Sequence, residues 1–110
     1  MAYDEQLAVR ITSLLQNHSD ITEKKMFGGI GYLVAGNMAC GVNGEDLIIR
    51  VGKDDYEAAL AREYTKPFDM TGRAMTGWVV ITPKGVSADE DLQKWVNWGE
   101  RYARSLPPKI

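Results

Sequence analysis

The residues of this chain that could perform nucleophilic chemistry are few. The sequence contains one cysteine, Cys40, and one histidine, His18. Cys40 alternates with Met38 and Val42 on one face of a predicted strand, which indicates a buried structural thiol. His18 comes at the C-terminal end of a predicted helix, where a cation or a hydrogen-bond donor is favourable. Because nothing in their spacing predicts that the two side chains meet, an enzyme built on them is only our third hypothesis.

Acidic side chains, which could serve as general acids or metal ligands, cluster at two places. Asp54-Asp55 and Asp89-Glu90-Asp91 both fall at the starts of predicted helices, where carboxylates interact favourably with the helix dipole. A metal site would need carboxylates beside the single histidine and cysteine, and no ligand pair has suitable spacing. We therefore predict no catalytic residue, no metal ligand and no cofactor.

Two glycine-rich segments match nucleotide-binding loops in spacing only. In the segment Gly29–Val34, Val34 stands where a dinucleotide fingerprint has its third glycine, and a strand rather than a helix follows. The segment Gly72–Gly77 has P-loop spacing, but Trp78 and Val79 replace the required lysine and hydroxyl residue. We assign these glycines to turns, bulges and close backbone packing, and we reject nucleotide binding.

One arginine lies inside the second of these segments. Arg73 is flanked by Gly72 and Gly77 and has few acidic neighbours other than Asp69. An arginine in such a loop is either solvated or reaches an anion or a partner with its planar fork of donors. A small-ligand or anion-binding domain that uses the Gly72–Gly77 loop with Arg73 is our alternative hypothesis.

Aromatic side chains gather on the last predicted helix. At about 100° per residue, Trp98 falls on the edge of the apolar stripe, beside Trp95 and Tyr102. Trp98 is then either a residue at the rim of the core or a partly exposed anchor, since Trp and Tyr are enriched at interface centres. Trp98, Tyr102 and Arg73 are our candidate interaction residues.

The composition predicts one globular domain over residues 1–110. The chain is 45% hydrophobic and carries 13 basic and 15 acidic residues, for a net charge of −2 and a pI near 5.3. Proteins that bind nucleic acid on their own usually carry a basic surplus, so we do not expect this chain alone to bind DNA. A single cysteine, with no signal peptide or membrane span in the sequence, favours the cytoplasm.

Helix signals stand at both ends of the sequence. Asp4 suits the N-cap of an amphipathic helix that runs to about Asn17. Ser87 and Glu90 have the spacing of a capping box before the last helix, which the prolines from Pro107 end.

Between these helices, turn signals and apolar runs predict an antiparallel sheet. Gly36-Asn37 and Asn43-Gly44 separate the runs, and these residues tolerate the positive φ of a type I′ turn. A short helix after Lys53 and an irregular region over 63–76 follow. The strands are expected near Ile30–Ala35, Met38–Val42, Leu47–Val51 and Trp78–Thr82. The predicted order is α-β-β-β-α-(β)-β-α, an α+β domain whose sheet is a meander plus one or two further strands, with helices packed on it.

Several short motifs, in this order, resemble one family. They are Lys25-Met26-Phe27-Gly28-Gly29, Gly36-Asn37-Met38-Ala39, the strand Leu47–Arg50, Gly77-Trp78, and a last helix with Trp95, Gly99 and Ser105-Leu106-Pro107-Pro108. Together they are similar to the N-terminal domain of the TfoX/Sxy family, which is linked to the regulation of natural competence. The resemblance implies an α+β domain related in shape to small secretion-chaperone-like folds. It also implies action with a transcription activator at promoters rather than catalysis.

Our leading hypothesis is a small cytoplasmic, non-enzymatic regulatory or adaptor domain that acts through protein contacts. We expect protein partners, with the transcription machinery and a second copy of the chain among the candidates, and neither a membrane nor DNA bound by the chain alone. Full-length members of the family carry a second, helical domain, so the resemblance implies no activity that needs that second half.

Overall fold

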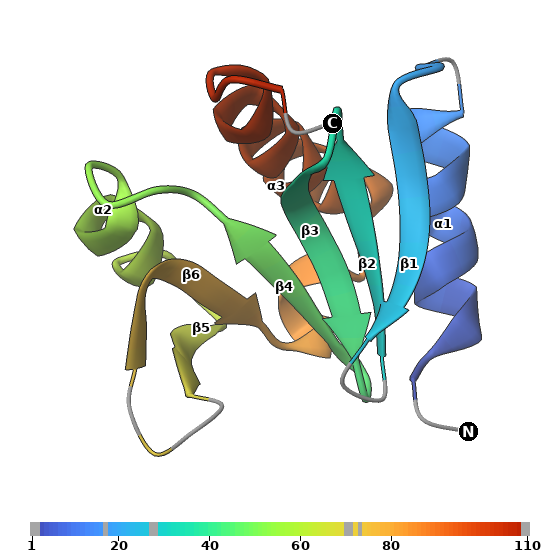
Figure 1. Cartoon of the computed structure of the whole chain (residues 1–110). Coiled ribbons are helices and arrows are strands. Elements are labelled where there is room, and N and C mark those ends of the chain that lie inside the picture. The colour runs from blue at the N-terminus through green and yellow to red at the C-terminus, as the bar shows by residue number, and fades with distance from the viewer. Residues whose placement is uncertain (1–2, 17, 27–28, 70–71, 73, 109–110) are drawn as a thin grey trace.

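The computed structural model describes residues 3–16, 18–26, 29–69, 72 and 74–108. It confirms the α+β class and the expected order of elements, with an antiparallel sheet and helices packed on it (Figure 1). The elements are α1 (Glu5–Leu15), β1 (Ile21–Met26), β2 (Gly29–Val34), β3 (Asn37–Asn43), β4 (Asp46–Arg50), α2 (Tyr56–Leu60), β5 (Thr65–Asp69), β6 (Ala74–Ile81), the 3₁₀ turn η1 (Pro83–Val86) and α3 (Asp89–Arg104).

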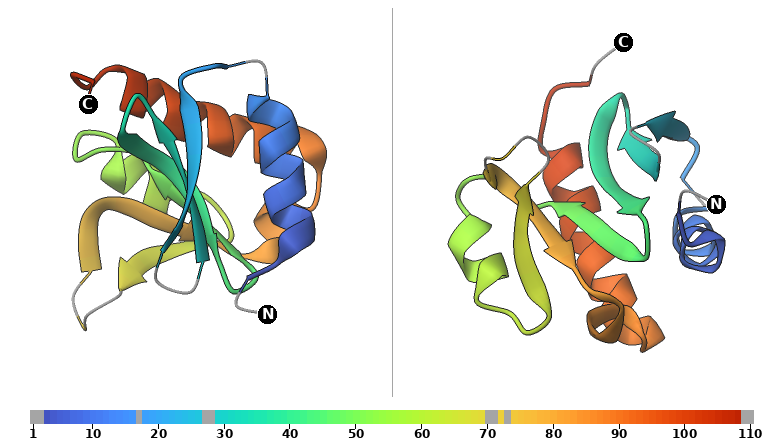
Figure 2. Two further views of the ribbon diagram at one scale, coloured as in Figure 1. Left: turned by 45° about the vertical axis from the view of Figure 1, so that its right-hand side comes forward. Right: turned by 90° about the horizontal axis from the view of Figure 1, so that it is seen from below.

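The six strands form one sheet in the order β1-β2-β3-β4-β6-β5, and every neighbouring pair is antiparallel. Both long helices lie behind the sheet in Figure 1, whose viewer looks onto the other face. Figure 2 shows α1 running alongside β1 while α3 runs across the sheet. No helix among the described residues is long and apolar enough to cross a membrane.

The core lies between the sheet and the two long helices. Alternate residues of the strands point to the same face because side chains in a strand have a period of two. This face meets the buried stripes of α1 and α3, including Ile11, Leu92 and Val96. The strand residues in this core are Ile30, Tyr32, Cys40, Val42, Leu47, Ile49, Val79 and Ile81.

A close backbone contact fixes how α3 crosses the sheet. Gly99 faces β3, and a Cβ built on it would lie 2.3 Å from the carbonyl oxygen of Ala39. No real Cβ approaches an oxygen so closely, so only glycine lets the helix backbone come this near to the strand. The apolar stripe of α3 is therefore seated directly on β3 and β4.

The structure adds β1 to the expected meander. β1 pairs with β2 in unbroken register from Ile21↔Val34 to Met26↔Gly29. Residues 22–25 of β1 are exposed at the edge of the sheet and are polar or charged. The sequence Ile-Thr-Glu-Lys-Lys-Met therefore lacks the alternation of apolar and polar residues by which a strand is recognised. The bracketed strand of the expected order is β5, within the region 63–76.

The first hairpin turn is one residue earlier than the sequence predicted. Ala35 (φ 49°) and Gly36 (φ 86°) occupy the left-handed region, so the turn is Ala35-Gly36 rather than Gly36-Asn37. Asn37 instead begins β3, where its buried side chain donates a hydrogen bond from Nδ2 to the carbonyl oxygen of Pro107 (2.9 Å). This hydrogen bond joins residues that are 70 positions apart, and it offsets the weak strand propensity of asparagine.

The second hairpin turn also differs from the expectation. Asn43 remains in β3 and pairs with Asp46 of β4, so the turn residues are Gly44 and Glu45. Of the residues in this turn, only Gly44 has a positive φ (59°). The type I′ expectation for Asn43-Gly44 was therefore wrong, because pairing with β4 keeps Asn43 extended.

The two helix-start predictions had different outcomes. Asp4 is the N-cap of α1, and its Oδ1 accepts hydrogen bonds from the amides of Gln6 (2.9 Å) and Leu7 (3.2 Å). The capping box was wrong: Ala88 is the N-cap of α3, with no side-chain cap. Ser87 follows η1 directly, and its Oγ donates to the carbonyl oxygen of Lys84 instead. The 3₁₀ turn therefore uses the hydroxyl that the capping box would need.

Candidate functional site

Trp98 lies at the rim of the core, on the side of α3 that faces α2. Its ring stacks on that of Trp95 with centroids 5.3 Å apart and planes at 11°. Nε1 donates a hydrogen bond of 3.0 Å to Oδ2 of Asp55, which precedes α2. The guanidinium of Arg62 lies 5.6 Å from the ring centroid, within the range of a cation–π interaction. Trp98 is therefore half-buried and held by three partners of different kinds.

Tyr102 lies one turn further along α3 and contacts the chain just after β4. A Cβ built on Gly52 would lie 2.3 Å from Cε1 of Tyr102, so the ring rests against bare backbone. The guanidinium of Arg50 is 5.5 Å from the Tyr102 ring and 5.3 Å from the Trp78 ring. The Trp78 ring in turn lies 6.2 Å from that of Phe68. One arginine thus links the aromatic side chains of α3 and β6.

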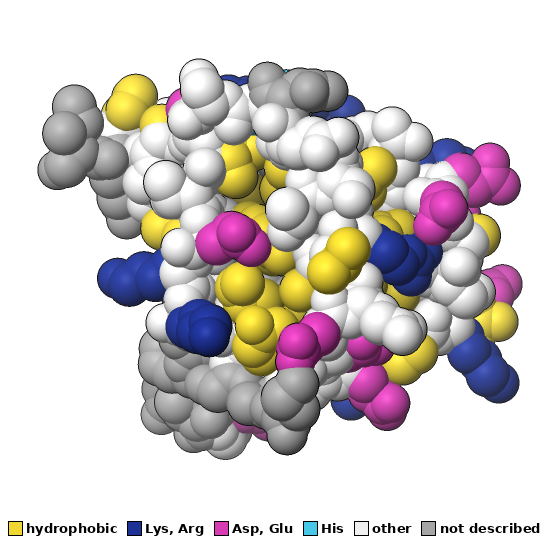
Figure 3. Space-filling model, turned by 90° about the vertical axis from the view of Figure 1, so that its right-hand side faces the viewer, with side chains coloured by type: hydrophobic (Ala, Val, Ile, Leu, Met, Phe, Trp, Pro, Cys, Tyr) yellow, Lys and Arg dark blue, Asp and Glu magenta, His cyan; other side chains and the backbone are white. Residues whose placement is uncertain are grey.

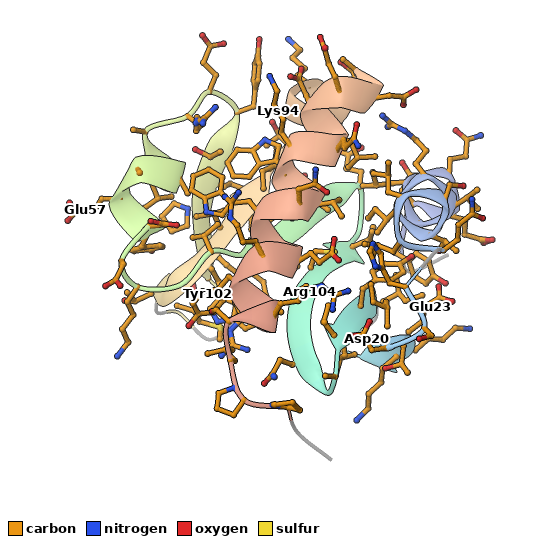
Figure 4. All side chains as sticks on the ribbon, turned by 90° about the horizontal axis from the view of Figure 1, so that it is seen from above. Asp20, Glu23, Glu57, Lys94, Tyr102 and Arg104 are labelled. Atoms are coloured by element: carbon orange, nitrogen blue, oxygen red, sulfur yellow. The ribbon has the colours of Figure 1, made fainter. Side chains whose placement is uncertain are left out.

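We call the surface formed by Asp55, Arg62, Trp98 and Tyr102 the α2–α3 surface. Figure 4, seen from above, shows side chains filling the space between these two helices, with Tyr102 pointing into it. Two hollows adjoin this surface. One hollow, of about 290 Å³, is lined by Arg62, Glu63, Tyr64, Lys84, Gly85, Asp91 and Trp95. The other, of about 370 Å³, is lined by Val51, Lys53, Asp54, Asp55, Tyr102 and Ser105.

The charges on the α2–α3 surface are mixed in sign. Arg62 and Lys84 line one hollow together with Glu63 and Asp91, while Asp54 and Asp55 line the other with Lys53. Such a surface does not attract polyanions, which need a run of unopposed cations. Flat aromatic rings beside arginine are instead typical of the residues that contribute most to protein–protein interfaces.

Of the predicted interaction residues, the structure brings two together. Trp98 and Tyr102 share the α2–α3 surface, whereas Arg73 lies outside the described residues. The sequence did not indicate the partners Asp55, Arg62 and Arg50. Asp55 and Trp98 are 43 residues apart, and no one-dimensional pattern connects them. The acidic pair at 54–55 was assigned to the helix dipole, and the structure gives Asp55 a more specific contact.

Cys40 and His18 do not form a catalytic pair. Cys40 is fully buried in the core, and burial raises the pKa of its thiol to about 12. Almost none of it is thiolate near neutral pH, and the thiolate is the nucleophile. His18 is exposed, and its Nε2 lies 3.4 Å from Oε2 of Glu100 on α3. The prediction of a buried structural thiol is confirmed.

A polar cluster that the sequence did not predict surrounds Glu100. The Arg104 guanidinium donates to Oδ2 of Asp20 (2.7 Å) and, through Nε, to Oε2 of Glu100 (2.9 Å). The hydrogen bond from Arg104 lowers the pKa of the Asp20 carboxyl below its usual value. Figure 4 shows Asp20 and Arg104 directed toward each other from the turn before β1 and from α3. The cluster, to which His18 also belongs, joins the α1–β1 turn to α3.

A third hollow, of about 380 Å³, lies on the sheet face that α1 and α3 leave uncovered, and its apolar lining includes Ile48, Phe68 and Val80. Among the described residues, no three His, Cys, Asp or Glu side chains come together in a way that could hold a metal ion. The distinctive surface features in the described part of the chain are therefore aromatic and apolar contact areas.

Together, the sheet order, the two helices on one face and the aromatic α2–α3 surface define an α+β domain with an aromatic surface beside α3. The chain belongs to the TfoX N-terminal domain family, whose family model matches residues 13–102. This match covers most of the sequence and every strand of the sheet. Comparisons with curated proteins and with solved structures give no match.

Proposed function

We propose that this chain is a non-enzymatic regulatory or adaptor domain of the cytoplasm that acts through protein contacts, as part of transcription or competence regulation. Membership of the TfoX N-terminal domain family supports the regulatory role. The observation that carries the contact role is the α2–α3 surface, where half-buried Trp98 and Tyr102 lie beside Arg62 and Arg50. Trp, Tyr and Arg are the residue types enriched among interface hot spots.

Rigidity makes this surface suited to binding. Trp98 is fixed by its stack on Trp95 and its hydrogen bond to Asp55, and Tyr102 rests on the backbone of Gly52. A partner that binds a side chain already held in place loses less conformational entropy than one that must order it. The two hollows, one lined by Arg62 and the other by Asp55 and Tyr102, provide concave places for side chains of a partner.

The charge and the thiol support contacts over two other kinds of function. The net charge of −2 and the mixed signs on the α2–α3 surface give little attraction for duplex DNA. The raised pKa of Cys40 argues against nucleophilic catalysis in the core. A protein partner, such as a transcription activator, therefore fits the surface better than a nucleic acid or a substrate.

The proposal can be tested by affinity capture from a native host extract. Immobilised wild-type chain should retain a specific protein at physiological salt, and Trp98→Ala should lose it while remaining folded. Val9→Ala is the matched control, because Val9 on α1 is an exposed apolar side chain (64% exposed) that is not part of the α2–α3 surface. Retention of the same protein by all three forms would place the contact elsewhere. Tight binding of the purified chain to duplex DNA would contradict the proposal as a whole.

A further inference from the structure

The two edges of the sheet differ in their capacity to accept another strand. β5 is interrupted: Pro67 has no N–H to donate, and its pairing with β6 shifts register between Pro67 and Asp69. β1 contains no proline, and it pairs with β2 over six consecutive residues without a bulge. Of the two edges, β1 is therefore the regular one.

The backbone groups of β1 that point away from the sheet can be identified. The N–H of Ala35 donates to the carbonyl oxygen of Asp20 (2.9 Å), which makes these two residues a hydrogen-bonded pair. Hydrogen-bonded pairs alternate along an antiparallel ladder, so Thr22 and Lys24 bond to β2. The N–H and C=O groups of Glu23 and Lys25 consequently point outward. The backbone N–H and C=O groups of these two residues are not used in pairing with β2, so β1 can offer them to a partner strand.

The side chains of this edge are predominantly cationic. Lys24 and Lys25 are exposed, and neither has a carboxylate within 4.0 Å among the residues that the structure describes. The carboxylate of Glu23 accepts a hydrogen bond from the hydroxyl of Thr12 on α1 (3.3 Å). Two uncompensated ammonium groups next to free backbone groups favour an extended partner that carries carboxylates.

Apolar surface lies beside the same edge. Because Glu23 reaches Thr12, the side of β1 that carries Glu23 and Lys25 faces α1. Leu14 of α1 and Ile21 of β1 are only partly buried there. Figure 3, which looks onto the side of the molecule where α1 and β1 lie, shows hydrophobic side chains in the middle of this face with charged ones around them. Alternate side chains of an added strand would cover this apolar area.

We propose that the β1 edge binds an extended, acidic segment of a partner protein by β-strand addition. The backbone of Glu23 and Lys25 supplies the ladder hydrogen bonds. The ammonium group of Lys24, on the face turned away from α1, pairs with carboxylates of the added strand, while the alternate apolar side chains cover the area beside α1. This surface is separate from the α2–α3 surface, so the proposal does not depend on the proposed function.

A second copy of the chain fits this edge less well than an acidic strand does. In a two-fold symmetric antiparallel pair of strands, a central residue lies opposite its own counterpart. Centred on Glu23, this places Glu23 against Glu23 of the other copy; centred on Lys24, it places Lys24 against Lys24, with Glu23 opposite Lys25 on either side. Each register thus contains one like-charge pair, which is destabilising. An acidic heterologous strand has no such conflict.

The probe is a fluorescent eight-residue peptide of alternating glutamate and valine, with an alternating lysine–valine peptide as its control. Anisotropy titration should show saturable binding of the acidic peptide that weakens as salt is raised through about 0.15 M, and binding of the basic peptide at least about tenfold weaker. Amide hydrogen exchange should slow at Glu23 and Lys25 on binding. Failure of the acidic peptide to bind, or protection at the α2–α3 surface instead, would overturn the proposal.

Two variants separate backbone pairing from charge. Lys25→Pro removes an outward N–H without removing a β1–β2 hydrogen bond, and it should abolish binding, whereas Lys25→Gln should weaken it only a few-fold. The double variant Lys24→Glu/Lys25→Glu keeps the backbone intact and should also abolish binding, which keeps the test decisive if the proline variant does not fold. Unchanged binding by folded Lys25→Pro contradicts strand addition. A wild-type dimer that Lys25→Pro converts to monomer would show that a second copy occupies the edge.

Discussion

The two tryptophans at the centre of α3 are held in different ways, although they are three residues apart and their rings stack. Trp95 is 8% exposed and lies in the core cluster, where its position follows from the shape of its apolar neighbours. Trp98 is half-buried, and its position follows from a hydrogen bond to Asp55 and the guanidinium of Arg62. A core position can change little without loss of stability, because its neighbours pack at the density of a crystal. A rim position held by polar contacts can serve recognition while the core stays intact.

The largest effect is expected at Trp95. Trp95→Ala should lower the free energy of unfolding by about 3–5 kcal/mol, because a large buried side chain is lost and a cavity remains. A domain of this size has about 5–15 kcal/mol in total, so the variant should melt at a much lower temperature. Denaturant unfolding followed by circular dichroism measures the change. A loss below about 1 kcal/mol would mean that Trp95 does not belong to the core.

Gly99 tests the close approach of α3 to β3. Gly99→Ala should cost about 1–3 kcal/mol despite the better helix propensity of alanine, because the new Cβ meets the carbonyl oxygen of Ala39. Asn97→Ala, at an exposed position of the same helix, is the control and should change stability by at most about 0.5 kcal/mol. A stabilised Gly99→Ala variant would mean that α3 can move away from β3 at little cost.

Trp98 distinguishes the rim from the core. Trp98→Ala should cost about 1 kcal/mol, since it loses a stacking contact and an exposed hydrogen bond. Trp98→Phe, which keeps an aromatic ring for the stack but lacks the N–H, should be milder still. If Trp98 is a partner anchor, Trp98→Ala should weaken association in a pull-down or sizing experiment while the melting temperature barely changes. A loss of stability equal to that of Trp95→Ala, with association unchanged, would make Trp98 a core residue only.

Cys40 provides a test of the core on the sheet side. Cys40→Ala should cost at most about 1 kcal/mol, as a small deletion at a buried site, and should leave cellular activity intact. The wild-type thiol should react slowly with a thiol reagent at neutral pH, because its pKa is raised to about 12 by burial. Fast labelling, together with loss of activity in the alanine variant, would revive the enzyme hypothesis.

The smallest effect concerns the polar cluster at the C-terminal end of α3. Hydrogen bonding from Arg104 lowers the pKa of Asp20 in the folded state, so this contact stabilises the fold above the unfolded pKa of about 3.9. The stabilisation is lost as pH falls through the lower folded value. The melting-temperature difference between wild type and Arg104→Gln should therefore be largest near neutral pH and vanish in acid. Arg101→Gln, at an exposed position of the same helix, should show no such pH dependence, and an equal one would contradict the assignment.

Much of the fold follows from local patterns in the sequence. The Asp4 cap, the apolar stripe of α3 and the shared core face of Leu47 and Ile49 in β4 follow from local patterns, and the structure contains them. In β3 the expected alternation of Met38 with Cys40 was wrong, because the register with β2 shifts between these two residues.

Another error lies where a distant contact accompanies the local conformation. Asn37 is extended and its side chain bonds to Pro107, 70 residues away. The start of α3 is a different, local error, because the adjacent turn η1 takes the hydroxyl of Ser87.

The candidate site could be predicted only in part. Trp98 and Tyr102 are recognisable from their place beside the apolar stripe of α3, since helical periodicity is a local property. Their partners Asp55, Arg62 and Arg50 are not, because they flank α2 or lie in β4 and meet α3 only through the tertiary fold.

The sequence by itself determined the α+β class, the family, the buried thiol and the aromatic face of α3. These depend on residue type and on periods of two or 3.6 residues, which act over short distances along the chain. The tertiary structure alone decided that β1 is an edge strand and which of its backbone groups point outward. It also decided that Trp98 contacts Asp55 and that Arg104 joins α3 to the α1–β1 turn. The physical reason is that pairing partners and charge neighbours are set by packing between distant segments, which no local pattern encodes.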